Sequence, residues 1–66
     1  MSTYRVCLQS VKQHEMIEHI KFDNKEDAEH YAKNNSATDN KHSYEVQINN
    51  NGQFTTIKSY LNGQPV

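Results

Sequence analysis

The sequence predicts a small α+β domain in which one α-helix packs on one face of a small antiparallel β-sheet, with the elements in the order ββαββ. Three observations support this prediction: an alternating run opens the chain, an amphipathic segment with helix-capping residues follows, and two further alternating runs meet at Asn51-Gly52. A sheet with one apolar face under a single helix is the simplest arrangement that buries such elements. The chain has 66 residues, so we expect one domain over residues 1–66.

The first strand is predicted at residues 3–10, "TYRVCLQS", where apolar and polar side chains alternate. This period of two is typical of a strand with one buried face. The two faces carry different sets of side chains: Tyr4, Val6 and Leu8 on the apolar side, and Arg5, Cys7 and Gln9 on the polar side.

The next segment, residues 11–22, fits either a strand or a helix. As a strand it places Met16, Ile20 and Phe22 on one face. As a helix beginning at Ser10 it has only a thin apolar stripe. The strand is favoured, and the sequence leaves the helix open.

This segment contains "HEMIEH", residues 14–19, which has the residue types of a metalloprotease helix. Such a helix needs histidines at positions i and i+4, but Glu18 stands four residues after His14 and the second histidine is His19. In a strand, His14 and His19 point to opposite faces and cannot share a metal. We therefore expect structural or solvent-facing histidines and no metal site.

A helix is predicted from "FDNKEDAEHYAKNN", residues 22–35. Asp23 has the N-cap position, Glu26 is its capping-box partner three residues later, and Phe22 precedes the cap as half of a hydrophobic staple. Residues 34 and 35, both Asn, are expected to end the helix. The face expected to lie on the sheet carries two small side chains and one large aromatic: Ala28, Tyr31 and Ala32.

The last two strands are predicted as a hairpin over residues 43–60, "SYEVQINNNGQFTTIKSY". Asn51-Gly52 favours the positive φ angles of a type I′ turn with a two-residue loop. A three-residue loop would instead pair Ile48 with Phe54, and the sequence leaves that register open. The two-residue loop pairs the strands as follows: Ile48/Thr55, Val46/Ile57 and Tyr44/Ser59 on one face, and Gln47/Thr56 and Glu45/Lys58 on the other.

Two polar segments flank the hairpin. Residues 34–43 form a connection of about ten residues, long enough to serve as a contact loop. Residues 61–66, "LNGQPV", contain a second Asn-Gly turn and are expected to fold back as a short edge segment.

Composition excludes several classes of function. A lone Cys7 excludes an internal disulfide and a zinc finger built on cysteine pairs. The net charge is −1, and the only two glycines lie in turns, so we expect no phosphate-binding loop, no cofactor and no enzyme.

No apolar run is long enough for a membrane span, which predicts a cytoplasmic protein without a membrane partner. So short a chain buries only about 60% of its unfolded surface, which favours association, for example as a homodimer.

The helix-free sheet face is the expected contact surface, because cations and aromatics gather there. The predicted partner-binding residues are Arg5, Lys21, Phe54, Lys58 and Tyr60. Aromatic and Arg side chains on an open, edge-bearing sheet are typical of protein interfaces, so a host or partner protein is the favoured ligand. The alternative is single-stranded nucleic acid, whose bases stack on aromatic rings while Lys and Arg bind its phosphates.

The order of elements is similar to that of several small phage inhibitors of bacterial defence systems, such as some anti-CRISPR proteins. This resemblance rests on architecture and size, and no motif is shared. It implies an inhibitor or regulator, from a phage or mobile element, that acts on a host protein complex.

Overall fold

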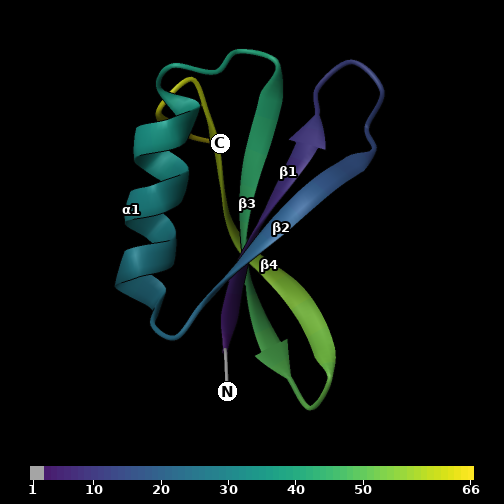
Figure 1. The fold of residues 1–66 in the computed structure, drawn as a ribbon, viewed down its shortest axis with the longest axis vertical. Coiled ribbons are helices and arrows are strands. Elements are labelled where there is room, and N and C mark those ends of the chain that lie inside the picture. Colours follow the sequence, from purple (N-terminus) through teal and green to yellow (C-terminus); the bar gives the residue numbers. More distant parts are fainter. Residues whose placement is uncertain (1–2) are drawn as a thin grey trace.

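The computed structural model describes residues 3–66, which form five strands and one helix (Figure 1). The strands make one antiparallel sheet in the order β2-β1-β3-β4-β5, and α1 packs on one face of it. The ββαββ prediction is confirmed, with β5 as a short addition. The elements are β1 (Tyr4–Ser10), β2 (Met16–Phe22), α1 (Lys25–Ser36), β3 (His42–Asn50), β4 (Gln53–Leu61) and β5 (Gln64–Pro65).

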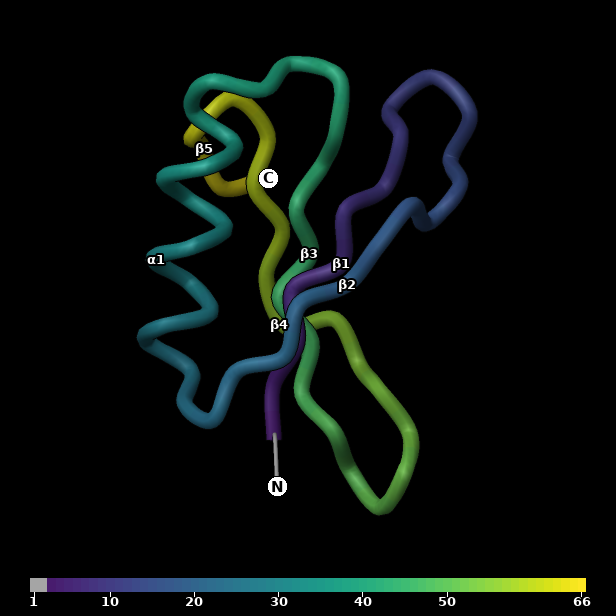
Figure 2. The backbone as a smooth tube through the Cα atoms, in the orientation of Figure 1, coloured from purple at the N-terminus to yellow at the C-terminus, as the bar shows by residue number. Residues whose placement is uncertain are grey.

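The sheet is strongly twisted, and its two hairpins point to opposite ends of the molecule (Figure 1). The β1–β2 loop lies at one end, and the β3–β4 turn extends past the helix at the other. The domain measures 31 × 22 × 17 Å along its principal axes. In Figure 2 the C-terminal segment with β5 lies beside the last turn of α1. The helix therefore covers one face only, and the opposite face stays uncovered.

Residues 16–22 form a strand, as the apolar alternation favoured. Val6 of β1 pairs with Ile20 of β2 on one side and with Val46 of β3 on the other. The β1–β2 register shifts between Leu8 and Gln9, so that Gln9 pairs with Met16. Because a shift of one residue reverses the faces of the residues beyond it, Met16 does not share a face with Ile20 and Phe22, as we had expected.

The β3–β4 hairpin has the expected two-residue loop. Asn50 pairs with Gln53 across Asn51-Gly52, whose φ angles are 53° and 88°. Both positive values belong to a type I′ turn. The Asn49 Oδ1 also accepts a hydrogen bond from the Gly52 amide at 2.9 Å. The three-residue alternative is therefore wrong, and the pairs Ile48/Thr55 and Gln47/Thr56 are confirmed.

Farther from the turn the expected register is wrong, because β4 contains a bulge. Gln47 pairs with Thr56, but the next residue of β3, Val46, pairs with Lys58 and leaves Ile57 as the extra residue. The expected pairs Val46/Ile57, Glu45/Lys58 and Tyr44/Ser59 are replaced by Val46/Lys58, Glu45/Ser59 and Tyr44/Tyr60. A one-residue slip moves each later side chain to the other face. Lys58 and Tyr60 consequently lie on the helix-covered side.

The helix begins one residue later and ends later than expected. Its N-cap is Asn24, not Asp23, because the Asn24 Oδ1 accepts a hydrogen bond from the Asp27 amide at 2.8 Å. The Asn24 Nδ2 donates in return to the Asp27 carboxylate at 3.0 Å, so Asp27 takes the capping role assigned to Glu26. The helix continues to Ser36, whose hydroxyl donates to the Lys33 carbonyl.

The core lies between α1 and the sheet. Ala28 and Ala32 are fully buried, which lets the helix approach the strands closely. Tyr31 fills the space beside them: its ring lies 5.3 Å from Phe22 and 6.3 Å from Tyr44, centroid to centroid. The buried core cluster contains Val6, Leu8, Ala28, Ala32, Tyr44, Val46 and Tyr60.

The C-terminal segment folds back as expected and forms β5. Leu61 pairs with Gln64 around Asn62-Gly63. Gly63 has a φ of +78°, and a Cβ there would lie 3.1 Å from that of Ala37, so this position strongly favours glycine. The Gly63 amide donates to the buried Ser36 hydroxyl at 3.0 Å, which ties the turn to the end of α1.

Candidate binding surface

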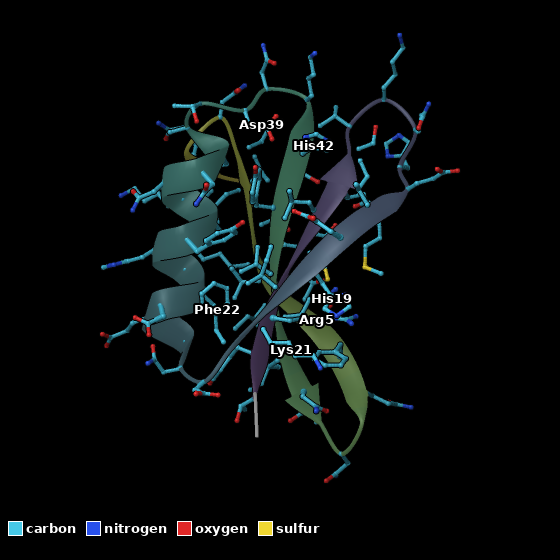
Figure 3. All side chains as sticks on the ribbon, viewed as in Figure 1. Arg5, His19, Lys21, Phe22, Asp39 and His42 are labelled. Carbon is cyan, nitrogen blue, oxygen red and sulfur yellow. The ribbon has the colours of Figure 1, made fainter. Side chains whose placement is uncertain are left out.

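The helix-free face of the sheet, here called the open face, collects polar side chains from four strands. Its members are Arg5, Cys7, His19, Lys21, Glu45, Gln47, Phe54 and Thr56. Arg5 lies between Lys21 of β2 and Gln47 of β3. Figure 3 shows Arg5, His19 and Lys21 on the side of the sheet away from α1, whereas Phe22 points toward the helix. The strand alternation thus brings these side chains together without any loop.

Gln47 makes three of the hydrogen bonds in a side-chain network on this face. Its Oε1 accepts from the Arg5 Nε at 2.7 Å and from the Cys7 Sγ at 3.2 Å. Its Nε2 donates to the Thr56 Oγ1 at 3.0 Å, and that hydroxyl donates to the Glu45 carboxylate at 2.9 Å. The network links β1, β3 and β4, and it leaves Gln47 and Thr56 in fixed orientations.

Arg5 and Phe54 form a stacked pair on the open face, near the β3–β4 turn. The Arg5 Cζ lies 3.7 Å from the centroid of the Phe54 ring, within the range of a cation–π contact. The guanidinium is therefore held from two directions, by the ring below it and by Gln47 at its Nε. Phe54 remains 36% exposed, so the pair presents an apolar surface and a charge to solvent together.

Cys7 lies beneath this network and is only 3% exposed. Burial raises the pKa of its thiol, Glu45 raises it further, and Arg5 opposes both. The thiol is thus protonated at neutral pH, which agrees with its role as a hydrogen-bond donor to Gln47.

The structure brings three of the five predicted binding residues together and separates the other two. Arg5, Lys21 and Phe54 share the open face. Tyr60 is 5% exposed and belongs to the core, and Lys58 lies on the helix-covered side with its Nζ 5.7 Å from the Tyr60 ring centroid. The prediction that Lys58 and Tyr60 lie on the helix-free face is therefore wrong, and the β4 bulge is the reason.

Sequence reasoning placed Gln47 and Thr56 on this face but assigned neither to the binding set. The structure makes both of them organisers of the face, because they fix the orientation of Arg5 and the position of Glu45. The predicted cross-strand pair Gln47/Thr56 was the available signal, since opposed polar side chains in a hairpin commonly bond to each other.

A second polar cluster orders the connection between α1 and β3. The Asp39 Oδ2 accepts a hydrogen bond from the Tyr44 hydroxyl at 2.8 Å and lies 2.9 Å from the His42 Nδ1. Partial burial alone would raise the pKa of Asp39, but hydrogen bonds from the Lys41 amide, Tyr44 and His42 outweigh burial and lower the pKa to about 2. Burial and the Asp39 charge raise the pKa of Tyr44. The connection is thereby held in place and is shorter than expected.

Beside this cluster lies an open hollow of about 590 Å³ between the β1–β2 loop and the α1–β3 connection. The two loops are joined by a hydrogen bond from the Val11 amide to the Lys41 carbonyl at 3.0 Å. The hollow is lined by Ser10, Val11, Lys12, Gln13, Asn40, Lys41 and His42. It lacks the stacked aromatic and the side-chain network that fix the open face.

The histidines of "HEMIEH" are separated in the structure. His14 lies in the β1–β2 loop with a φ of 59°, and His19 lies on β2 across from Cys7. Over residues 3–66, no group of three or more His, Cys, Asp or Glu side chains is placed to hold a metal ion.

Within the described part of the chain, no helix has both the length and the apolar character needed to cross a membrane. No protein-family model matches the chain, and no curated protein or solved structure matches it significantly. A function must therefore be inferred from the open face itself.

Proposed function

We propose that the protein is a non-enzymatic binding protein that contacts a partner protein through its open face. The observation that carries this proposal is the Arg5 guanidinium stacked on a partly exposed Phe54 ring on an uncovered sheet face. Arg and aromatic side chains are enriched in protein interfaces and dominate their hot spots.

The pre-organisation of this face supports the same proposal. Gln47 and Phe54 hold Arg5 before any partner arrives, so binding would lose little side-chain entropy. The surface is also continuous with the outer edge of β2, which the sheet order leaves unpaired. An uncovered face beside an uncovered edge offers both side-chain and main-chain contacts to a protein.

Single-stranded nucleic acid is the less favoured ligand. Its bases need exposed ring faces for stacking, but Tyr60 is buried in the core and Arg5 covers one face of Phe54. Glu45 also lies on the open face, where its negative charge repels phosphate. A protein partner therefore fits the surface better.

We further propose that binding serves inhibition or regulation of a host protein complex in the cytoplasm. The support for this role is the resemblance of the element order to small phage inhibitors of bacterial defence systems. A domain that binds through one sheet face can act by occupying a surface that its partner needs.

Affinity capture from a bacterial lysate, with and without nuclease, tests the proposed function. The bait proteins are the wild type, Phe54→Ala on the open face, and Lys33→Ala on exposed α1 as the matched control. We expect the wild type and the control to enrich the same protein, Phe54→Ala to lose it, and nuclease to have no effect. Capture that survives Phe54→Ala, or that nuclease abolishes, would contradict the proposal, provided that circular dichroism shows all three baits folded.

A further inference from the structure

We propose that the open face recognises a carboxylate of an acidic, extended segment of its protein partner, and that Arg5 binds this carboxylate with its two terminal nitrogens. This inference rests on the proposed function and specifies the chemistry of the partner. Its components are the Arg5 guanidinium, the neighbouring Lys21 ammonium and His19 imidazole, and the free edge of β2.

The Arg5 guanidinium has N–H donors that make no hydrogen bond within the described residues. Its Nε donates to Gln47 and its plane lies over Phe54, but no acceptor in residues 3–66 is bonded to its terminal nitrogens. The single ion pair found in that range joins His42 and Asp39 at the far end of β3. A planar fork whose orientation is already fixed is suited to bidentate binding of a carboxylate.

The cations on the open face outnumber its carboxylates. Arg5 and Lys21 are direct cross-strand partners on one face, an arrangement of like charges that is unfavourable. His19 lies two residues from Lys21 on the same face. Among the described residues, Glu45 is the one carboxylate on this face, and it bonds to Thr56 and forms no ion pair with Arg5 or Lys21. A bound anion would remove the repulsion between Arg5 and Lys21.

Other acidic side chains lie elsewhere in the fold. Glu18 pairs with Leu8, so it lies on the helix-covered side, where its charge contributes to raising the pKa of Tyr31. Glu26 and Asp27 lie in the exposed first turn of α1. On the open face itself, as residues 3–66 form it, the cations Arg5 and Lys21 face a single carboxylate, that of Glu45.

The form of the ligand follows from the position of Lys21 and His19. Lys21 and His19 lie on β2, the edge strand, and its outer backbone groups have no partner strand in the sheet. An extended segment added there would place alternate side chains beside Lys21 and His19. The positive groups are confined to one part of the face, next to Glu45, which fits separate carboxylates better than a continuous phosphate backbone.

Nuclear magnetic resonance titration of the isotope-labelled full chain tests this inference. The probes are an alternating Glu/Thr hexapeptide and the matched Gln/Thr hexapeptide. We expect only the acidic peptide to produce saturable shifts at the Arg5 Nε–H and along β2. Arg5→Lys keeps the charge but loses the planar fork, and it should weaken binding about tenfold or more. Lys41→Gln, beside the distant hollow, should have no effect on the binding curve.

Several results would overturn the inference. Equal shifts with the neutral peptide, or unchanged affinity in a folded Arg5→Lys variant, would show that Arg5 does not recognise a carboxylate. Tighter binding of a single-stranded thymidine hexamer at the same nuclei would assign the site to nucleic acid. Shifts that depend on protein concentration alone would assign the occupant to a second copy. If Phe54-dependent capture persists while the acidic peptide fails, the inference is wrong and the proposed function stands; if capture is independent of Phe54, the proposed function itself fails.

Discussion

The two faces of the sheet come from the same strands but have different compositions. On the covered face, Val6 and Val46 pair with each other and are fully buried under α1. One residue away on the same strands, Arg5 and Gln47 pair on the open face and bond through their side chains. The covered face supplies the hydrophobic stabilisation, and the open face is held by polar contacts that leave its outer surface free. Stability and binding should therefore respond to different substitutions.

The largest expected effect is on the covered face. Tyr60→Ala removes a buried aromatic from the core cluster and should cost about 3–5 kcal/mol, enough to unfold most of so small a domain. Urea denaturation followed by circular dichroism measures this cost. Phe54→Ala is the matched aromatic control on the open face. If Tyr60→Ala were no more destabilising than Phe54→Ala, the β4 bulge and the division between the two faces would be wrong.

A smaller effect is expected from Asp39, which stabilises the end of the covered face through Tyr44. Because the folded state lowers the pKa of Asp39 to about 2, its contribution is present above the ordinary carboxyl pKa and is lost as the pH falls through about 2. Asp39→Asn should cost about 1 kcal/mol at pH 7, since the group is only half-buried, and little near pH 2. Thermal melts across that pH range, with Glu15→Gln as the exposed control, measure the difference. A constant difference at all pH values would contradict this assignment.

A still smaller effect on stability is expected from Gln47→Leu, which breaks the open-face network. Loss of partly exposed side-chain hydrogen bonds should cost about 0.5–1 kcal/mol. The orientation of Arg5 should suffer more than the fold does. The Arg5 Nε–H resonance should lose its protection from solvent exchange while the core resonances remain unchanged. Unchanged exchange at this group would show that Phe54 alone positions Arg5.

The smallest expected effect concerns Cys7, whose thiol should be nearly inert in the folded protein. Burial and a raised pKa both lower the amount of accessible thiolate at neutral pH. Labelling with a thiol reagent should be much slower than for a free cysteine and should become fast in denaturant. Rapid labelling of the folded chain would indicate that the open face is not the tight surface described above.

Local sequence signals predicted the elements well because each signal acts within a few residues. The Asn51-Gly52 turn, the alternation in β1 and the Ala28/Ala32 face of α1 are of this kind. The β4 bulge could not be predicted in the same way. Whether Ile57 or Tyr60 enters the core depends on the packing of β4 against β3 and α1, which no local pattern specifies.

The candidate site was predictable to the extent that it depends on strands before the bulge. Arg5, Lys21 and Phe54 were placed correctly because β1 alternates regularly and the hairpin register holds near its turn. Lys58 and Tyr60 lie beyond the bulge and were placed on the wrong face. The hydrogen bonds of Gln47 could not be predicted, because they depend on side-chain orientations that are set only when β1, β3 and β4 lie side by side.

The most direct test of the central claim is to measure Phe54→Ala twice, for unfolding free energy and for the dissociation constant of the captured partner. Because Phe54 is 36% exposed and lies outside the core, stability should fall by less than about 1.5 kcal/mol. Affinity for the partner should fall at least about tenfold, or about 1.4 kcal/mol. A Phe54→Ala protein that binds its partner with wild-type affinity, or that unfolds as Tyr60→Ala should, would contradict the account.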